Sequence, residues 1–261
     1  MLKTAKNIAV SALDPQKTGV MARKVLNRFI GARGSLSLAH NRQWLEGQSI
    51  SDQDWLKPDD AALWALAQAR YQEFLDGDVR RIRGLYPPEI HGPGGAYAML
   101  YFLVRKHQPQ TVVETGISLG TSSHAILRAM QENKEGKLYS SDFPYFRVEN
   151  PEKYIGLLVP EEKEWRDRWH IFLEGDAKNL PAILETISQV DLFHYDSDKS
   201  IEGRDLAYKL MAPKMARGGM MLFDDIHDNP HFHDLVKREA LEARSRIIEY
   251  HGKYIGVIEG F

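Results

Sequence analysis

The sequence contains no cysteine, which excludes disulfides, thiolate metal sites and a cysteine nucleophile. It also lacks any apolar run near the ~20 residues that a transmembrane helix requires. The first sixteen residues have no continuous apolar core after their lysines, so they do not resemble a signal peptide. From these absences we expect a cytoplasmic protein without a transmembrane segment.

The net charge of −2 over 261 residues argues neither for nor against a charged partner, so the charge balance of the whole chain is uninformative. The charge is unevenly distributed, however, because residues 1–45 hold eight basic residues and one acidic residue, Asp14. This basic arm could make a peripheral contact with an anionic surface, or contact a nucleic acid or an acidic neighbouring subunit. A solvated helix face or a partly disordered arm explains the same pattern.

Residues 1–90 have the pattern of a helical extension, which we expect to form a lid or an oligomer contact. Apolar residues at helical spacing predict a helix over 18–30, and the run after Pro58 predicts another over about 61–75. Trp44, Trp55 and Trp64 fit the core of a helical bundle, although they could also line an acceptor pocket or a dimer interface.

From residue 91 onward, strand and helix patterns alternate to the end of the chain. Apolar runs predict strands at 111–115, 137–142, 169–176, 190–196 and 218–225, with helices between them. Two last strands, at 245–251 and 254–260, have no helix between them and predict an antiparallel pair at the sheet edge. Residues 91–261 therefore predict an α/β fold with a Rossmann-like, seven-stranded, mostly parallel sheet.

The most informative stretch is a buried strand, a glycine-bearing turn and a helix start, from Val112 to Ser123. Glycines let a backbone approach a ligand closely, and a helix N-terminus offers unpaired amides. Because position 118 is serine, the G-x-G-x-x-G dinucleotide fingerprint fails, and because Thr121 follows Gly120, a phosphate-binding P-loop fails as well. The remaining pattern is E-x-G-x-x-x-G.

This pattern resembles motif I of class I S-adenosylmethionine-dependent methyltransferases. Two further elements resemble that family: Asp142, which ends the next strand 28 residues after Glu114, and the Gly175-Asp176-Ala177 sequence after the third strand. The resemblance implies S-adenosylmethionine as the cofactor. It implies a cofactor site made of Glu114, Gly116, Gly120, Thr121, Ser122, Asp142, Asp176 and Asp196.

Three aspartates follow the fourth and fifth strands of the predicted sheet. Neighbouring parallel strands end at the same edge, so we expect Asp196, Asp224 and Asp225 to lie close together. Because clustered carboxylates repel each other, a bound divalent cation is a natural partner; oxygen ligands favour magnesium, calcium or manganese, whereas added imidazole from His227 would favour manganese or zinc. Alternatively, these aspartates are helix caps and loop residues.

The same region resembles the metal-dependent O-methyltransferases of the catechol, caffeoyl-CoA and cephalosporin-pathway type. The resemblance implies that Asp196, Asp224 and Asp225 bind a divalent ion, magnesium above all, which lowers the pKa of the acceptor hydroxyl. Lys199, three residues after Asp196, has the spacing of a catalytic base. Related bacterial proteins read D-G-D-H-S where this chain reads D-S-D-K-S, so the base stays open between Lys199 and His227.

We therefore predict an enzyme that methylates a hydroxyl of a small molecule, a sugar or a glycan, and that forms a homo-oligomer. A metal-independent methyltransferase acting on nitrogen or a carboxylate, or a non-catalytic scaffold, is the alternative. A nucleic-acid substrate is not expected, because YDSDK stands where base N-methylases carry N-P-P-Y. His124, His231 and His233 are expected to be structural or solvated, whereas His91 could line the acceptor side.

Overall fold

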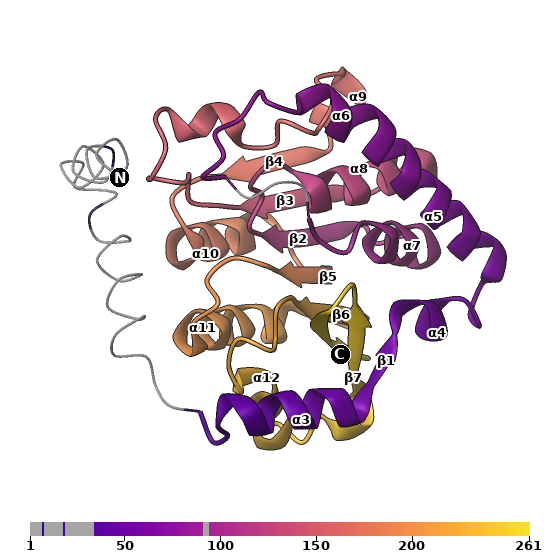
Figure 1. Cartoon of the computed structure of the whole chain (residues 1–261), viewed down its shortest axis with the longest axis vertical. Helices are drawn as coiled ribbons and strands as arrows, with labels where there is room; N and C mark the ends of the chain where they lie inside the picture. The colour runs from indigo at the N-terminus through magenta and orange to yellow at the C-terminus, as the bar shows by residue number, and fades with distance from the viewer. Residues whose placement is uncertain (1–6, 8–17, 19–33, 91–93) are drawn as a thin grey trace.

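The computed structural model describes residues 7, 18, 34–90 and 94–261 (Figure 1). The predicted helix over 18–30 and the candidate His91 therefore lie outside the described residues, apart from Thr18. Within the described part, no helix is long and apolar enough to cross a membrane.

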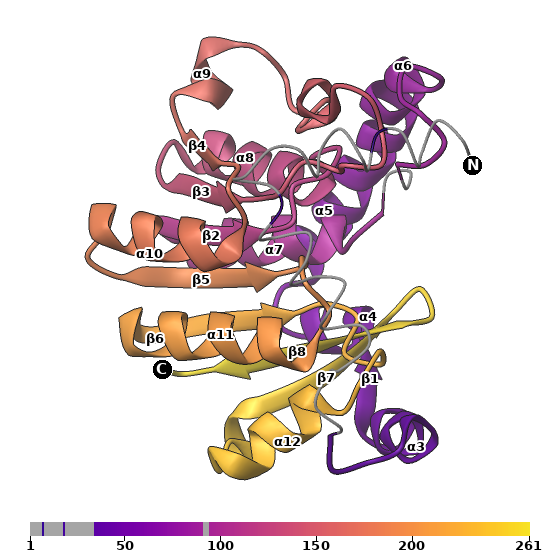
Figure 2. The same cartoon turned by 90° about the vertical axis from the view of Figure 1, so that its left-hand side faces the viewer.

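The described chain forms one eight-stranded sheet flanked by helices (Figures 1 and 2). The strand order is β1-β7-β8-β6-β5-β2-β3-β4, and every pair is parallel except those that include β8. The strands are β1 (Ser49–Ser51), β2 (Thr111–Thr115), β3 (Lys137–Ser141), β4 (Trp169–Phe172), β5 (Val190–Tyr195), β6 (Met215–Phe223), β7 (Ser245–Tyr250) and β8 (Lys253–Glu259).

The helices cover both faces of the sheet. They are α3 (Leu38–Gln48), α4 (Asp52–Leu56), α5 (Ala61–Phe74), α6 (Arg80–Ile82), α7 (Tyr97–His107), α8 (Thr121–Asn133), α9 (Lys163–Arg166), α10 (Asp176–Thr186), α11 (Ile201–Met211) and α12 (His231–Arg238). A π-helix, η1 (Leu75–Val79), continues α5, and short 3-10 turns lie at η2 (Pro151–Tyr154), η3 (Ala212–Lys214) and η4 (Glu242–Arg244).

Two apolar cores result from the alternation of side chains along the central strands. Val112 and Leu192 belong to the core formed with α5, α7 and α8, whereas their neighbours Val113 and Phe193 belong to the core formed with α10, α11 and α12. Successive side chains on a strand point to opposite faces, so a strand buried on both faces is a continuous apolar run. This burial explains why β2 and β5 were recognisable from the sequence.

The structure confirms the predicted α/β fold and all seven predicted strands, with two corrections. The described extension is not purely helical, because Ser49–Ser51 pairs with β7 as an eighth strand. The terminal strand pair is antiparallel as predicted, but it does not form the edge: β8 lies between β6 and β7, and β1 lies beyond β7. β1 was not predicted because its three residues are too few to show the alternating pattern of a strand.

The described extension packs directly on the sheet domain. Trp64 of α5 is buried, with its ring 6.1 Å from that of Phe102 on α7, which agrees with a core role. Phe74 is fully buried, and its ring lies 4.5 Å from Tyr97 and 4.7 Å from His124. The extension therefore shares a core with the sheet, and a domain boundary at residue 90 stays a prediction.

We predict that Phe74→Ala lowers the free energy of unfolding by about 3–5 kcal/mol, because it leaves a cavity between α5, α7 and α8. Urea denaturation measures this change. Leu85→Ala is the control: Leu85 is 60 % exposed, and its truncation should change stability by less than about 0.5 kcal/mol. Equal effects of the two substitutions would contradict the shared core.

Candidate functional site

The candidate site lies at the carboxyl ends of the central strands. β2 has β3 on one side and β5 on the other, so successive crossovers run in opposite directions from β2. In open α/β sheets, such a switch point leaves a crevice where ligands bind. The predicted residues follow β2, β3, β4, β5 and β6 at this end, where Figure 2 shows β5 and β6 running side by side in the same direction.

The turn after β2 depends on glycine at two positions. Gly116 has φ +84° and Gly120 has φ +93°, both in the left-handed region. A Cβ on Gly116 would lie only 2.1 Å from the carbonyl oxygen of Asp196, so the turn packs against the loop after β5 without room for a side chain. The backbone NH of Asp196 in turn donates to the carbonyl of Thr115 at 3.1 Å. The two loops are thereby fixed to each other.

Asp142 connects the same turn to β3. Its Oδ2 accepts a hydrogen bond from the backbone NH of Ser118 at 2.8 Å, and its Oδ1 accepts from the NH of Phe143 at 2.6 Å. Asp176 opens α10, and its carboxylate accepts hydrogen bonds from the hydroxyls of Ser141 and Ser197. Both aspartates therefore lie at the carboxyl-end edge of the sheet and connect neighbouring loops.

Glu114 lies at the carboxyl end of β2, fully buried beneath the turn. Its carboxylate accepts hydrogen bonds from the hydroxyls of Ser122 at 2.9 Å, Ser140 at 2.6 Å and Ser123. Burial raises the pKa of Glu114 to about 7 in spite of these hydrogen bonds. The contacts of Glu114 thus attach the start of α8 to β2 and β3.

Ser123 and Ser140, which hydrogen-bond to Glu114, were not predicted as site residues, although Ser123 adjoins a predicted one.

The start of α8 has no side-chain cap, because its N-cap residue, Gly120, has no side chain that could accept a hydrogen bond. The amides of Thr121 and its neighbours have no cap from that residue. Such a helix start is a common anion- or ligand-binding element.

The three predicted acids meet as expected. One carboxylate oxygen from each of Asp196, Asp224 and Asp225 lies within 4.8 Å of the other two. Asp224 is almost fully buried, and its Oδ1 accepts from the NH of Asp225 at 2.9 Å. Burial, together with the charge of Asp196, raises the pKa of Asp224 to about 6. A cation beside this cluster would favour the ionised form.

Two lysines contact the acidic cluster. Nζ of Lys199 forms ion pairs with Asp196 and, at 3.2 Å, with Oδ2 of Asp225. Nζ of Lys253, the first residue of β8, lies 3.0 Å from Oδ1 of Asp225. Burial lowers the pKa of Lys199, but the three carboxylates outweigh it, so the net shift is upward and Lys199 carries a proton. No sequence pattern indicated Lys253, which joins the site only through strand pairing.

A buried arginine supports the acidic loops from below. Arg204 of α11 is fully buried, and its Nη2 donates to the carbonyls of Asp224 at 3.0 Å and Asp225 at 2.8 Å. Its Nη1 donates to Oδ1 of Asn229 at 3.3 Å, and the Asn229 amide donates to the carbonyl of Lys199 at 2.6 Å. Arg204 and Asn229 therefore fix the loops after β5 and β6 relative to each other.

Four histidines considered in the sequence analysis are not members of this cluster. Nε2 of His227 is 3.5 Å from Asp228. Among the described residues, His227 does not belong to any group of side chains placed closely enough to hold a metal ion together. His231 is buried with Nε2 3.0 Å from Asp205, and Nδ1 of His233 lies 2.9 Å from Asp234. His124 is buried between Tyr97 and Asp78. The last three are structural, as the sequence suggested.

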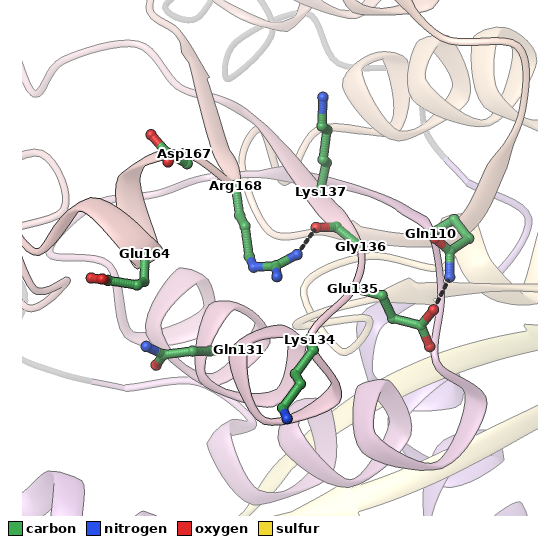
Figure 3. A pocket seen from close by; sticks show the side chains of 9 residues that line it. All are labelled: Gln110, Gln131, Lys134, Glu135, Gly136, Lys137, Glu164, Asp167 and Arg168. Carbon is green, nitrogen blue, oxygen red and sulfur yellow. Dashed lines mark hydrogen bonds between the residues drawn. The ribbon is translucent and has the colours of Figure 1, made fainter.

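A groove of about 750 Å³ lies at the opposite end of the sheet, before β2 and β3 (Figure 3). Its charged side chains are mixed in sign, and several polar groups bond to each other: Arg168 donates to the carbonyl of Gly136 at 3.0 Å, and Gln110 donates to Glu135 at 2.8 Å. None of the predicted site residues lines it. This groove is therefore separate from the predicted site at the carboxyl ends of the strands.

A family model matches the central part of the chain. Residues 113–226 match the family model described as "Methyltransferase domain". No curated protein sequence matches the chain at a significant level.

Solved structures match the fold at low sequence identity. A candidate O-methyltransferase from Klebsiella pneumoniae is 16% identical, with a TM-score of 0.55 over 72% of this chain and 89% of that one. An O-methyltransferase from Bacillus cereus in complex with SAH is 14% identical, with a TM-score of 0.51 over 82% and 99%. A candidate caffeoyl-CoA O-methyltransferase from Staphylococcus aureus is 11% identical, with a TM-score of 0.53 over 77% and 100%.

We predict that Gly116→Ala destabilises the protein by several kcal/mol, because its Cβ would overlap the Asp196 carbonyl in addition to straining the backbone. Gly218→Ala is the matched control: Gly218 has φ +80°, but a Cβ there meets no atom within 4 Å. It should show only the ~1–2 kcal/mol cost of the left-handed conformation. Urea denaturation measures the free energy of unfolding of both variants, and the difference between them gives the cost of the steric overlap with Asp196. Equal losses of unfolding free energy in the two variants would contradict the close packing at Gly116.

A second prediction concerns pH. Because the folded-state pKa of Glu114 is raised to about 7, the folded protein retains this proton where the unfolded chain releases it. The stability linked to that proton is present below about pH 4.5 and is lost as the pH rises through about 7. Relative to Glu114→Gln, the wild type should lose on the order of 2–3 kcal/mol of unfolding free energy between pH 4.5 and 8. If the free energies of unfolding of the wild type and Glu114→Gln change in parallel with pH, Glu114 does not titrate in this range.

Proposed function

We propose that this chain, whose residues 113–226 match a methyltransferase domain, transfers the methyl group of S-adenosylmethionine to a hydroxyl oxygen of a small molecule or sugar, assisted by a divalent cation. The observation that carries the proposal is the convergence of Asp196, Asp224 and Asp225 on one point. This point adjoins the glycine turn, because Gly116 packs against the backbone of Asp196.

The residues present fit the cofactor. Gly116 and Gly120 keep the turn free of side chains, and the start of α8 has no side-chain cap from Gly120. Asp142 lies at the end of the strand next to β2, where a carboxylate can accept hydrogen bonds from ribose hydroxyls. Glu114 holds the turn from below, and Asp176 would lie on the adenine side. The Bacillus cereus structure of the same fold was determined with SAH.

The residues present also fit a divalent ion. The donor set consists of carboxylate oxygens, which magnesium prefers, and the buried Asp224 has a raised pKa that a nearby cation would reverse. Asp196, Asp224 and Asp225 would hold the ion. When bound, such an ion lowers the pKa of an acceptor hydroxyl.

The chain's own residues would orient the acceptor and remove its proton. Lys199 and His227 are the two candidates for the proton acceptor, and they differ in their surroundings. Lys199 carries a proton beside the three carboxylates, so it could act as the base only after losing that proton. Lys199 contacts two members of the cluster, whereas His227 contacts Asp228. Catalysis would then depend mainly on positioning and on electrostatic stabilisation of the developing charge.

Metal-independent transfer is the second candidate, and one observation favours it. Lys199 and Lys253 already balance two of the three carboxylate charges, so protein ammonium groups could serve where the ion would. Assaying a panel of hydroxylated acceptors with magnesium and with a chelator distinguishes the two. Undiminished activity in chelator would reject the metal and leave the methyltransferase intact.

We predict that Asp224→Asn lowers turnover at least about a hundredfold and abolishes stimulation by magnesium, because the cluster loses its buried ligand. Its affinity for S-adenosylmethionine, measured by isothermal titration calorimetry, should stay within about threefold of the wild type. Asp167→Asn, which changes a mostly exposed aspartate outside the site, is the control and should behave as the wild type. Failure of the folded wild type to bind S-adenosylmethionine would overturn the proposed function itself.

A further inference from the structure

The carboxylate of Asp225 is bracketed by two ammonium groups. Oδ2 lies 3.2 Å from Lys199 and Oδ1 lies 3.0 Å from Lys253. A metal ion bound by Asp225 would need one of these oxygens. The ion and one ammonium group would therefore share an oxygen, and because both are positively charged they repel each other at that distance.

Of the two lysines, Lys253 can break its contact with Asp225 with the smaller loss of free energy. Its side chain is 47% exposed, whereas that of Lys199 is 25% exposed and pairs with both Asp196 and Asp225. A lysine has a flexible stem and a strongly hydrated head, so a half-exposed one can turn into solvent while its stem stays packed.

The backbone places Lys253 beside Asp225. Lys253 pairs with Tyr250 across the hairpin whose turn is formed by His251 and Gly252, both at positive φ. The NH of Ile226 donates to the carbonyl of Tyr254 at 3.1 Å, which attaches the loop after β6 to the first residues of β8. The strand register thus holds the backbone of Lys253 where its side chain can reach Asp225.

We infer that Lys253 is an internal counter-cation that competes with a divalent ion for Asp225 and thereby weakens metal binding at the acidic cluster. This inference rests on the proposed metal site. With both lysines in place, the three carboxylates keep a net charge of about −1, and withdrawal of Lys253 makes it about −2. The cluster should therefore attract a divalent ion more strongly without Lys253.

The test is metal affinity of the purified full-length chain, measured by isothermal titration calorimetry with Mn²⁺ and Mg²⁺. We expect Lys253→Met to bind Mn²⁺ at least about tenfold more tightly than the wild type. Lys253→Gln repeats the test with a polar side chain, and Lys253→Arg, which keeps the charge, should stay within about threefold of the wild type. Circular dichroism checks that each variant is folded.

Lys237→Met is the matched control, because Lys237 is 58% exposed and pairs with Glu242 away from the site. It should not change Mn²⁺ affinity. Binding by Lys253→Met alone would support the inference even where the wild type binds no metal. Equal or weaker binding by Lys253→Met than by the wild type would overturn the role of Lys253 and leave the metal site standing. Absence of binding in every variant, with S-adenosylmethionine still bound, would reject both the metal site and its competitor.

Discussion

The close approach of Gly116 to the backbone of Asp196 is the contact on which the candidate site depends. With no Cβ at position 116, the turn after β2 and the loop after β5 touch, and the NH of Asp196 bonds to Thr115 in the same place. One loop bears the glycine turn and the other bears the first acid of the cluster. The two halves of the proposed site are therefore held in a fixed relative position by direct backbone contact, as transfer between two bound molecules would require.

Charge balance is the second constraint. Three carboxylates at the end of β5 and β6, one of them almost fully buried, are stable only beside cations. Lys199 and Lys253 supply two positive charges by direct contact, and Arg204 supplies a third through the carbonyls beneath them. Any cation or acceptor bound at the cluster would have to fit into this arrangement, so the lysines would influence its binding as well as the stability of the loops.

Sequence patterns predicted the parts of the site that depend on strand ends. Glu114, Asp142 and Asp196 each lie where a recognisable buried strand stops, and parallel strands bring these positions together. Lys253 and Arg204 could not be predicted, because the first enters through an antiparallel pairing and the second through helix packing. The same limit explains β1, whose three residues acquire a strand conformation only by pairing with β7.

The described extension also contributes to the site. α8 begins at the glycine turn, and its buried His124 lies 3.3 Å from Asp78 of η1 and 3.0 Å from the hydroxyl of Tyr97. Phe74 packs on the same histidine ring. A π-helical turn is uncommon and costs regular hydrogen bonding, and here it carries the carboxylate that meets His124. Withdrawal of α5 and η1 would leave His124 without its carboxylate partner and expose Phe74. The helix that starts the proposed cofactor site is thus held from both sides: from the sheet by Glu114, and from the extension by Asp78.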